Sequence, residues 1–395
     1  MVKQVGKWTE MRAADFIEFN PRMSIKKGTI ATKVAMDKLQ PFTKKIPDTE
    51  KAPFSGGSKF RNGDTIMARI TPCLENGKTA FVDILGEDEI AFGSTEFIVM
   101  RAKEGVSDPQ FIYYLATSPS FRNIAIKSMV GSSGRQRVQQ TVLDELVLSV
   151  PPLEEQKKIS SLLCVLDQKI ALNNEINDNL HQQTRTLLTQ WQIKHEGEYD
   201  FSLLSDVAVI NPDTYSPKDA WEYVNYLDTS SITDGIISEV QCIKPLTEKL
   251  PSRARRIISA NDVVFSTVRP NQHHFGIITE PLENMLASTG FAVIRSRHPL
   301  ISNELLYLCL TENSFIEKMQ QLAEQSTSTF PSIKPSDLGV CKIPCPIDQD
   351  LSDALNTLFA CITANQRENT SLSALRDTLL PKLMSGEIDV SGIQL

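Results

Sequence analysis

The sequence is 395 residues long, with 41% hydrophobic and 23% charged residues and a formal net charge of −7 at pH 7. This length predicts two or three domains, each able to bury a core. No apolar run reaches the roughly 18 residues of a membrane span. The opening MVKQVGKWTE lacks the apolar centre of a signal peptide, so the sequence predicts a cytoplasmic protein.

Charge is unevenly distributed along the chain. Residues 1–150 hold 21 Lys and Arg against 17 Asp and Glu, a net +4, whereas residues 195–350 hold 12 against 21, a net −9. A local basic surface can bind a polyanion although the total charge is negative. The seven cysteines are scattered, and Cys341 and Cys345 have no second Cys or His pair nearby. We therefore expect reduced thiols, no disulfide framework and no metal site.

The first part of the chain predicts an α/β head. It opens with ADFIEFNPRM (14–23), followed by strand-like runs in KFRNGDTIMARITP (59–72) and GSTEFIVMRA (93–102). A helical phrase, FIYYLATSPSFRNIAIKSM (111–129), and a Gly/Ser-rich loop come next. A short strand closed by prolines lies within VLDELVLSVPPLEEQ (142–156) and ends the head.

Residues 153–194 predict a single helix roughly 60 Å long at 1.5 Å per residue. Its seam residues alternate in steps of three and four, which is a heptad pattern. They are Leu163, Leu166, Ile170, Asn173, Asn177, Leu180, Thr184, Leu187 and Trp191.

The second half repeats the first in the same order. SDVAVINPDT (205–214), RIISANDVVFSTVRP (256–270) and ASTGFAVIRS (287–296) match the three phrases that open the first half. LLYLCLTENSFIEKMQQLA (305–323) and PSDLGVCKIPCPIDQ (335–349) match the helical phrase and the closing strand. Such a repeat predicts two similar domains.

The second long helix repeats the heptad seam 192 residues later, with seven of nine residues identical. Its seam is Leu355, Leu358, Ile362, Asn365, Asn369, Leu372, Arg376, Leu379 and Leu383. Two matching narrow seams predict an antiparallel coiled coil in which Asn173 and Asn177 meet Asn365 and Asn369, because polar seam residues set register at a cost in stability.

Two alternatives stay open for these helices. Each helix could pack only on its own head, and the asparagines could simply be tolerated in a solvated gap. Pro381 is expected to break or kink the second helix near its end.

The predicted fold is therefore a pseudo-two-fold repeat of α/β (α+β) heads joined and separated by two long helices. The expected domains are a first head (1–150), a first spacer helix (151–195), a second head (196–346), and a second helix with a tail (347–395).

Patterns typical of enzymes are incomplete in this sequence. Asn76–Thr79 resembles the end of a phosphate loop, but Pro72 stands where the first glycine belongs. Phe54–Ser58 resembles an S-adenosylmethionine turn, with Ser58 in place of a glycine and no clear strand before it. Asn20-Pro21 and Asn211-Pro212 begin a methyltransferase pocket motif that the next residues do not continue, so we expect turns there. The five histidines form no catalytic spacing. The sequence favours a protein without a catalytic centre.

In this arrangement the chain resembles the DNA specificity subunit of type I restriction-modification systems over essentially its whole length. The resemblance rests on the repeat, the phrases NGDTIMARITP and NDVVFSTVRP, the junctions SVPPLEEQKKI and KIPCPIDQD, and the ending RDTLLPKLMSGEIDV. The second junction departs from the first, with Asp348-Gln349-Asp350 where the first has Glu154-Glu155-Gln156.

The resemblance implies that each head is a target-recognition domain for one half of an asymmetric, interrupted sequence in double-stranded DNA. It also implies that the long helices dock two methylation subunits, with restriction subunits added in some systems. S-adenosylmethionine, ATP and Mg are then expected in the partner subunits, and no cofactor or metal in this chain.

Basic, amide and imidazole side chains on loops and strand ends are the candidate DNA contacts, because lysines suit phosphates whereas Arg, Asn and Gln can read base edges. In the first head they are Lys26, Lys27, Lys44, Lys45, Lys59, Arg61, Arg69, Lys78, Arg135 and Arg137. In the second they are Arg253, Arg255, Arg256, Arg269, Asn271, Gln272, His273 and His274.

Two other functions stay open at this point. A coiled-coil scaffold with two protein-binding heads would bind no DNA, so it would lack the steep salt dependence of phosphate contacts. An enzyme with an unrecognised site would be revealed by methyl transfer or cleavage by the chain alone.

Overall fold

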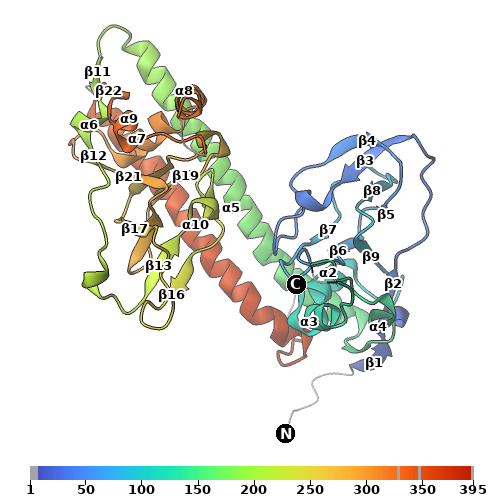
Figure 1. Ribbon diagram of the computed structural model, residues 1–395. Helices are drawn as coiled ribbons and strands as arrows, with labels where there is room; N and C mark the ends of the chain where they lie inside the picture. The colour runs from blue at the N-terminus through green and yellow to red at the C-terminus, as the bar shows by residue number, and fades with distance from the viewer. Residues whose placement is uncertain (1–7, 133, 327–329, 346–347, 393–395) are drawn as a thin grey trace. The chain divides into compact units, whose positions relative to one another are not determined.

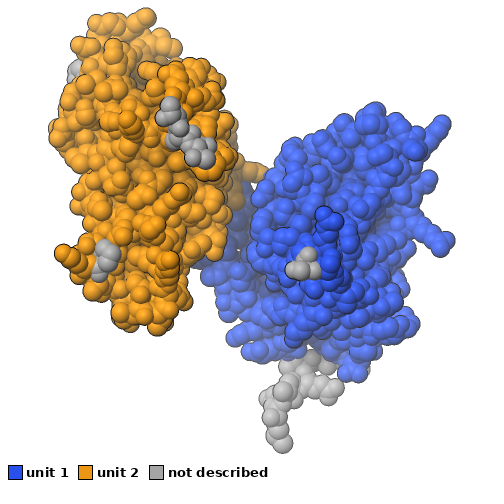
Figure 2. All heavy atoms as spheres, viewed as in Figure 1, with its two compact units in different colours: residues 1–173, 368–395 blue, residues 174–367 orange. Residues whose placement is uncertain are grey.

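The computed structural model describes residues 8–132, 134–326, 330–345 and 348–392. These ranges exclude the opening residues 1–7, part of the second Ser/Thr-rich loop and Pro346 of the second junction. The chain forms two compact units (Figure 2), one of residues 1–173 with 368–395 and one of residues 174–367. Each unit holds one α/β head and a section of both long helices.

We call the α/β part of the first unit head 1. Its strands are β1 (Thr9–Arg12), β2 (Ile17–Phe19), β3 (Ile30–Val34), β4 (Glu50–Pro53), β5 (Ser58–Phe60), β6 (Thr65–Ala68), β7 (Thr79–Phe81), β8 (Ala91–Gly93), β9 (Phe97–Ala102) and β10 (Val147–Val150). Its helices are α1 (Ala13–Phe16), η1 (Met36–Lys38), α2 (Pro109–Thr117), α3 (Pro119–Lys127) and α4 (Gln140–Asp144).

We call the α/β part of the second unit head 2. Its strands are β11 (Asp200–Leu203), β12 (Ala208–Ile210), β13 (Val224–Leu227), β14 (Ile232–Thr233), β15 (Ile236–Ile237), β16 (Gln241–Ile243), β17 (Ala254–Ile257), β18 (Asp262–Ser266), β19 (Phe275–Ile278), β20 (Met285–Ser288), β21 (Phe291–Ser296) and β22 (Lys342–Cys345). Its helices are α6 (Leu204–Val207), η2 (Pro217–Asp219), η3 (Thr229–Ser231), η4 (Pro270–Gln272), α7 (Asn303–Leu310), α8 (Asn313–Glu324) and α9 (Pro335–Gly339).

The sheet topology of head 2 duplicates that of head 1 (Figure 1). The order β2-β9-β6-β7 recurs as β12-β21-β18-β19, and both sheets are antiparallel. The order β4-β3-β8-β5 recurs as β16-β13-β20-β17, with a parallel central pair in both heads. The pairs β1-β10 and β11-β22 close the heads, and the hairpin β14-β15 is found in head 2. The predicted repeat of two α/β heads is confirmed.

The asparagines of the two Asn-Pro phrases occupy equivalent turns. Asn20 and Asn211 have φ of 48° and 56°, the left-handed region in which asparagine is tolerated. The side-chain oxygen of Asn20 accepts from the backbone N–H of Val99, and that of Asn211 accepts from Val293, both at 3.0 Å. The phrase is common to both heads because it fixes the end of β2 or β12 against the neighbouring strand.

Each predicted helical phrase is in fact two helices. The first divides between α2 and α3 at Ser118, just before Pro119, because proline lacks the N–H that would continue the hydrogen-bond ladder. The second divides between α7 and α8 at Thr311 and Glu312. Asp108 and Ser302 cap the starts of α2 and α7 by accepting from Phe111 and Leu305 N–H.

The two long helices are α5 (Leu153–Lys194, 42 residues) and α10 (Gln349–Met384, 36 residues), drawn green and red in Figure 1. α10 continues through Pro381 and ends three residues later. No helix within the described ranges is long and apolar enough to cross a membrane.

The long helices pair in antiparallel register within each unit. In the first unit the amide of Asn173 donates to the side-chain oxygen of Asn369 at 2.9 Å. In the second unit Asn365 donates to Asn177 at 2.8 Å. Moving four residues forward along α5 therefore moves the partner four residues back along α10, as expected for the predicted seam.

The helices also pack against the heads, so helix–helix and helix–head contacts are both present. Leu163 of α5 and Leu383 of α10 join Phe111 and Tyr114 in the core of head 1. Leu355 and Ile362 join Leu305 of α7 in the core of head 2. The two asparagines of α5 do not line a solvated gap, because Asn173 and Asn177 are 0% and 7% exposed.

Candidate nucleic-acid interface

Each head contains a site where a crossing segment binds to the end of a central strand. In head 1 the segment 136–138 crosses the chain just after β6: Thr71 N–H donates to Gln136 at 3.0 Å and Val138 N–H to Arg69 at 2.9 Å. In head 2 Arg269 N–H donates to Pro331 and Ile333 N–H to Thr267, both at 2.9 Å. We call these two equivalent places the strand-end niches.

The niche of head 1 holds an exposed ion pair. Arg137 Nε lies 3.0 Å from both carboxylate oxygens of Glu96, and its Nη2 lies 2.6 Å from Oε1. The hydrogen bonds with Glu96 raise the pKa of Arg137. Arg69 lies in the same niche, half-buried, with Nη2 donating to the Val138 carbonyl at 3.2 Å.

The niche of head 2 holds an arginine on an aromatic ring. The guanidinium of Arg269 lies 4.8 Å from the ring centre of Phe330, a cation–π distance. Arg269 has φ of 49°, and Pro270 directly follows it and begins η4.

The η4 loop borders a hollow of about 470 Å³ in head 2. The backbone N–H of Asn271 donates to Gln320 Oε1 at 3.3 Å, and His273 Nδ1 lies 2.8 Å from Asp234 Oδ1. His274 Nδ1 lies 2.6 Å from the Ile232 carbonyl. The hollow is lined by Asn271, His273, Asn313, Ile316, Glu317, Gln320 and Gln321. Amides and imidazoles on such a loop are groups that can read base edges.

The remaining candidate DNA contacts differ in their exposure and in their contacts with the rest of the protein. Those with exposed side chains are Lys26, Lys27, Lys45, Arg61, Arg135, Arg253 and Gln272. Lys59 lies over the Phe54 ring, Lys78 donates to the Met36 carbonyl, and Arg255 donates to the Ser252 carbonyl. Arg256 is half-buried, and burial lowers its pKa.

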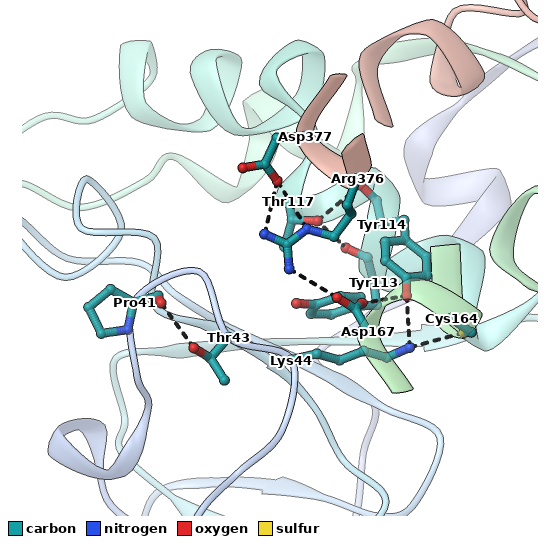
Figure 3. A network of polar contacts seen from close by, with 10 residues as sticks. All are labelled: Pro41, Thr43, Lys44, Tyr113, Tyr114, Thr117, Cys164, Asp167, Arg376 and Asp377. Carbon is teal, nitrogen blue, oxygen red and sulfur yellow. Dashed lines mark hydrogen bonds and ion pairs between the residues drawn. The ribbon is translucent and has the colours of Figure 1, made fainter. Parts of the chain in front are cut away.

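Lys44 points into the first unit instead of toward solvent (Figure 3). Its ammonium donates to the Tyr114 hydroxyl at 3.2 Å and contacts Cys164 Sγ at 3.1 Å, above the Tyr114 ring. Tyr114 in turn donates to Asp167 at 2.6 Å, and Arg376 binds the other oxygen of Asp167 at 2.9 Å. This network ties head 1 to α5 and α10, so we omit Lys44 from the proposed DNA contacts.

Sequence reasoning missed the carboxylates and rings that orient the basic groups. Glu96, Asp234 and Phe330 contact Arg137, His273 and Arg269 from distant parts of the chain. The neighbouring residues in the sequence give no sign of these pairings. Buried Arg101–Asp64 and Arg295–Asp262 pairs, by contrast, recur in both heads, and their residues stand in the repeated phrases.

The described residues contain no group of three or more His, Cys, Asp or Glu side chains that could hold a metal ion. The turn after Phe54 joins β4 to β5 and leads into no helix, so it lacks the strand-to-helix geometry of a nucleotide site. A strand does precede this turn, contrary to the expectation from sequence.

Two α/β heads of one topology, each with basic side chains around a strand-end niche, define an internally duplicated α/β protein. Residues 6–182 match the model of the type I restriction modification DNA specificity domain. The type I restriction enzyme HindI specificity subunit of Haemophilus influenzae is 23% identical over 87% of this chain and 90% of its own length. The EcoAI specificity subunit of Escherichia coli is 32% identical over 37% of this chain and 24% of its own length.

A solved structure supports the fold. The type I restriction-modification system S subunit from M. genitalium matches with a TM-score of 0.52 at 17% identity, covering 96% of each chain. Residues 6–182 therefore match the specificity-domain family, and over most of its length the present chain is similar to specificity subunits of type I restriction-modification systems.

Proposed function

We propose that each head reads one half of an asymmetric, bipartite target in double-stranded DNA, and that the chain itself catalyses no reaction. The observation that carries this proposal is the duplication of one topology with different side chains at equivalent positions. Glu96 corresponds to Gly290 and Arg137 to Ser332, since the same backbone hydrogen bonds surround them. Two heads of one shape with different surfaces are suited to two different half-sites.

The partners in this proposal are two methylation subunits that dock on the long helices. In the first unit, Val165, Leu172 and Leu375 are apolar side chains 58%, 50% and 48% exposed on α5 and α10, outside the seam. Exposed apolar groups on a helix surface suit a protein partner. S-adenosylmethionine is expected in these methylation subunits, with ATP and Mg in restriction subunits where a system has them.

Genome-wide adenine methylation tests the function. Cells carrying this gene with its neighbouring methylation gene are compared with cells lacking only this gene. We expect one bipartite motif to disappear on deletion, and to return on complementation. Unchanged methylation with an active methylation subunit would favour a scaffold instead, as would DNA binding by the complex that does not weaken as salt rises.

Docking is tested by a double substitution, Val165→Glu with Leu172→Glu. We expect loss of co-purification with the methylation subunit, because charged groups would be buried in the interface. Leu246→Glu is the matched control, since Leu246 is 87% exposed and lies in head 2. Equal loss in both variants would contradict docking at α5.

A further inference from the structure

Each strand-end niche has one arginine whose guanidinium is held by a neighbouring acidic or aromatic side chain. The second arginine of the head 1 niche, Arg69, is half-buried and donates to the Val138 carbonyl. Arg137 of head 1 lies on the crossing segment, and its counterpart in head 2 is Ser332. Arg269 of head 2 lies at the strand end, and its counterpart in head 1 is Thr71, since Thr71 N–H and Arg269 N–H make equivalent bonds to Gln136 and Pro331. The arginine is thus present in both niches although the position that supplies it differs.

The niche of head 1 fixes the plane of the Arg137 guanidinium. Glu96 occupies the edge formed by Nε and Nη2, with distances of 2.6 to 3.0 Å. The adjacent edge, formed by Nη1 and Nη2, is not the one that the Glu96 carboxylate occupies. The side chain of Arg137 is 45% exposed, and its backbone is held by reciprocal bonds with Val130 at 2.9 and 3.1 Å. The Arg137 guanidinium is thus held along one edge by Glu96 while the side chain stays accessible to a ligand.

In the niche of head 2 an aromatic ring contacts the arginine. Cζ of Arg269 lies 4.8 Å from the centre of the Phe330 ring, a cation–π contact. Stacking on a ring leaves the in-plane N–H groups of an arginine available for hydrogen bonds. The short η4 turn begins directly after Arg269, at the buried Pro270.

We infer that Arg137 and Arg269 are the principal base-reading residues of the two heads, each donating two parallel hydrogen bonds to a guanine in its own half-site. This inference rests on the proposed function. A guanine presents N7 and O6 as paired acceptors in the major groove, the geometry that a fixed guanidinium fork matches. Phosphate contacts need no such orientation and suit exposed lysines such as Lys26 and Lys27.

The test uses the complex of the full chain with its methylation subunit, and duplexes in which each base pair of the target is replaced in turn. For Arg137→Ala and Arg137→Lys, we expect discrimination at one G·C pair of one half-site to fall roughly 5- to 150-fold. Discrimination in the other half-site should stay unchanged, which shows that the complex is folded. Arg269→Ala should have the mirror effect in the other half-site.

Glu96→Gln should reduce discrimination at the same G·C pair as Arg137→Ala, because the fork loses its charged support. Arg12→Ala is the matched control: Arg12 is likewise an exposed arginine paired with carboxylates, Asp15 and Glu145, and both half-sites should be read normally.

Two results would overturn the inference. Equal loss of methylation on every duplex would mean a phosphate contact, and an unchanged motif in the Arg137 or Arg269 variants would mean no contact with bases. Failure of the proposed function is distinguishable, since the wild-type complex would then give no bipartite motif that depends on this chain.

Discussion

Each head pairs one buried aspartate with an arginine. Arg101 binds Asp64 at 2.7 Å, with side chains 14% and 1% exposed, and Arg295 binds Asp262 at 2.7 Å in the equivalent place. The hydrogen bonds that Arg295 donates to Asp262 are the main reason that the pKa of Arg295 is raised. Removing one partner of a buried pair leaves a desolvated charge, which costs more than the pair itself contributes.

Asp64→Asn should therefore lower the free energy of unfolding by about 3–5 kcal/mol. Urea unfolding of the purified chain, followed by circular dichroism, measures the change. Asp15→Asn removes one carboxylate partner of Arg12 in the same head, where both side chains are more than half exposed. Solvent screens that pair, so its loss should have little effect. Similar losses for both variants would contradict the argument from burial.

A half-buried histidine predicts a pH effect in the second unit. His181 packs edge-on against Phe359 at 5.8 Å, and burial lowers its pKa below the ordinary value, with Arg185 adding to the shift. The unfolded chain then takes up the proton at a higher pH than the folded chain. The stabilisation that neutral His181 gives to the folded state is complete above about pH 6.5 and is lost as the pH falls.

We therefore expect the stability of the wild type to fall between pH 7.5 and 5.5 more steeply than that of His181→Gln. Urea unfolding of both proteins at each pH measures the difference, and the other four histidines are common to both. Parallel curves would show that His181 is protonated equally in the folded and unfolded states.

At the scale of elements, the seam of α5 and α10 combines leucines with two pairs of asparagines. Asn177 is buried; its Oδ1 accepts from Asn365, and its amide reaches the Ile362 carbonyl at 3.4 Å. A buried amide is less favourable than leucine unless its bonds are complete, but it penalises every register that separates the pair. Specificity of pairing is thus obtained at a cost in stability.

Asn365→Leu alone should destabilise the second unit by about 1–3 kcal/mol, because Asn177 Oδ1 would lose its donor while staying buried. Asn177→Leu with Asn365→Leu should restore or exceed the wild-type stability, since no amide would remain unpaired. Thermal unfolding of the three proteins decides the sign. A double variant weaker than the single variant would mean that the asparagines contribute through packing.

At the scale of the whole molecule, α5 and α10 are the proposed spacer. One heptad inserted in each helix, between Lys169 and Ile170 and between Leu372 and Ser373, keeps the seam in phase. It adds roughly 10 Å at 1.5 Å per residue, about three base pairs of duplex. We expect both half-sites to be read as before, with a longer gap in the methylated motif.

Four-residue insertions at the same places are the control for that experiment. They shift the seam out of phase, so the helices should pair poorly and methylation should be lost. An unchanged gap in the heptad variant would mean that the helices do not set the spacing.

The repeat, the two heads and the register of the long helices could be predicted from the sequence, because each depends on patterns that are local in the chain. A heptad seam needs only neighbours three and four residues apart, and the two asparagine pairs mark the register directly. Pro119 could have indicated the break between α2 and α3. The apolar pattern continues on both sides of this proline, however, and so favoured a single helix.

Only the tertiary structure decided which basic side chains face solvent and how each is held. Lys26 and Lys44 look alike in the sequence, but Lys26 is exposed whereas Lys44 lies against Tyr114 and Cys164. Glu96 and Phe330 reach their arginines through strand pairing and crossing segments. Such contacts depend on which strands pair in the folded chain. The sequence around a charged or aromatic residue does not identify its distant partner.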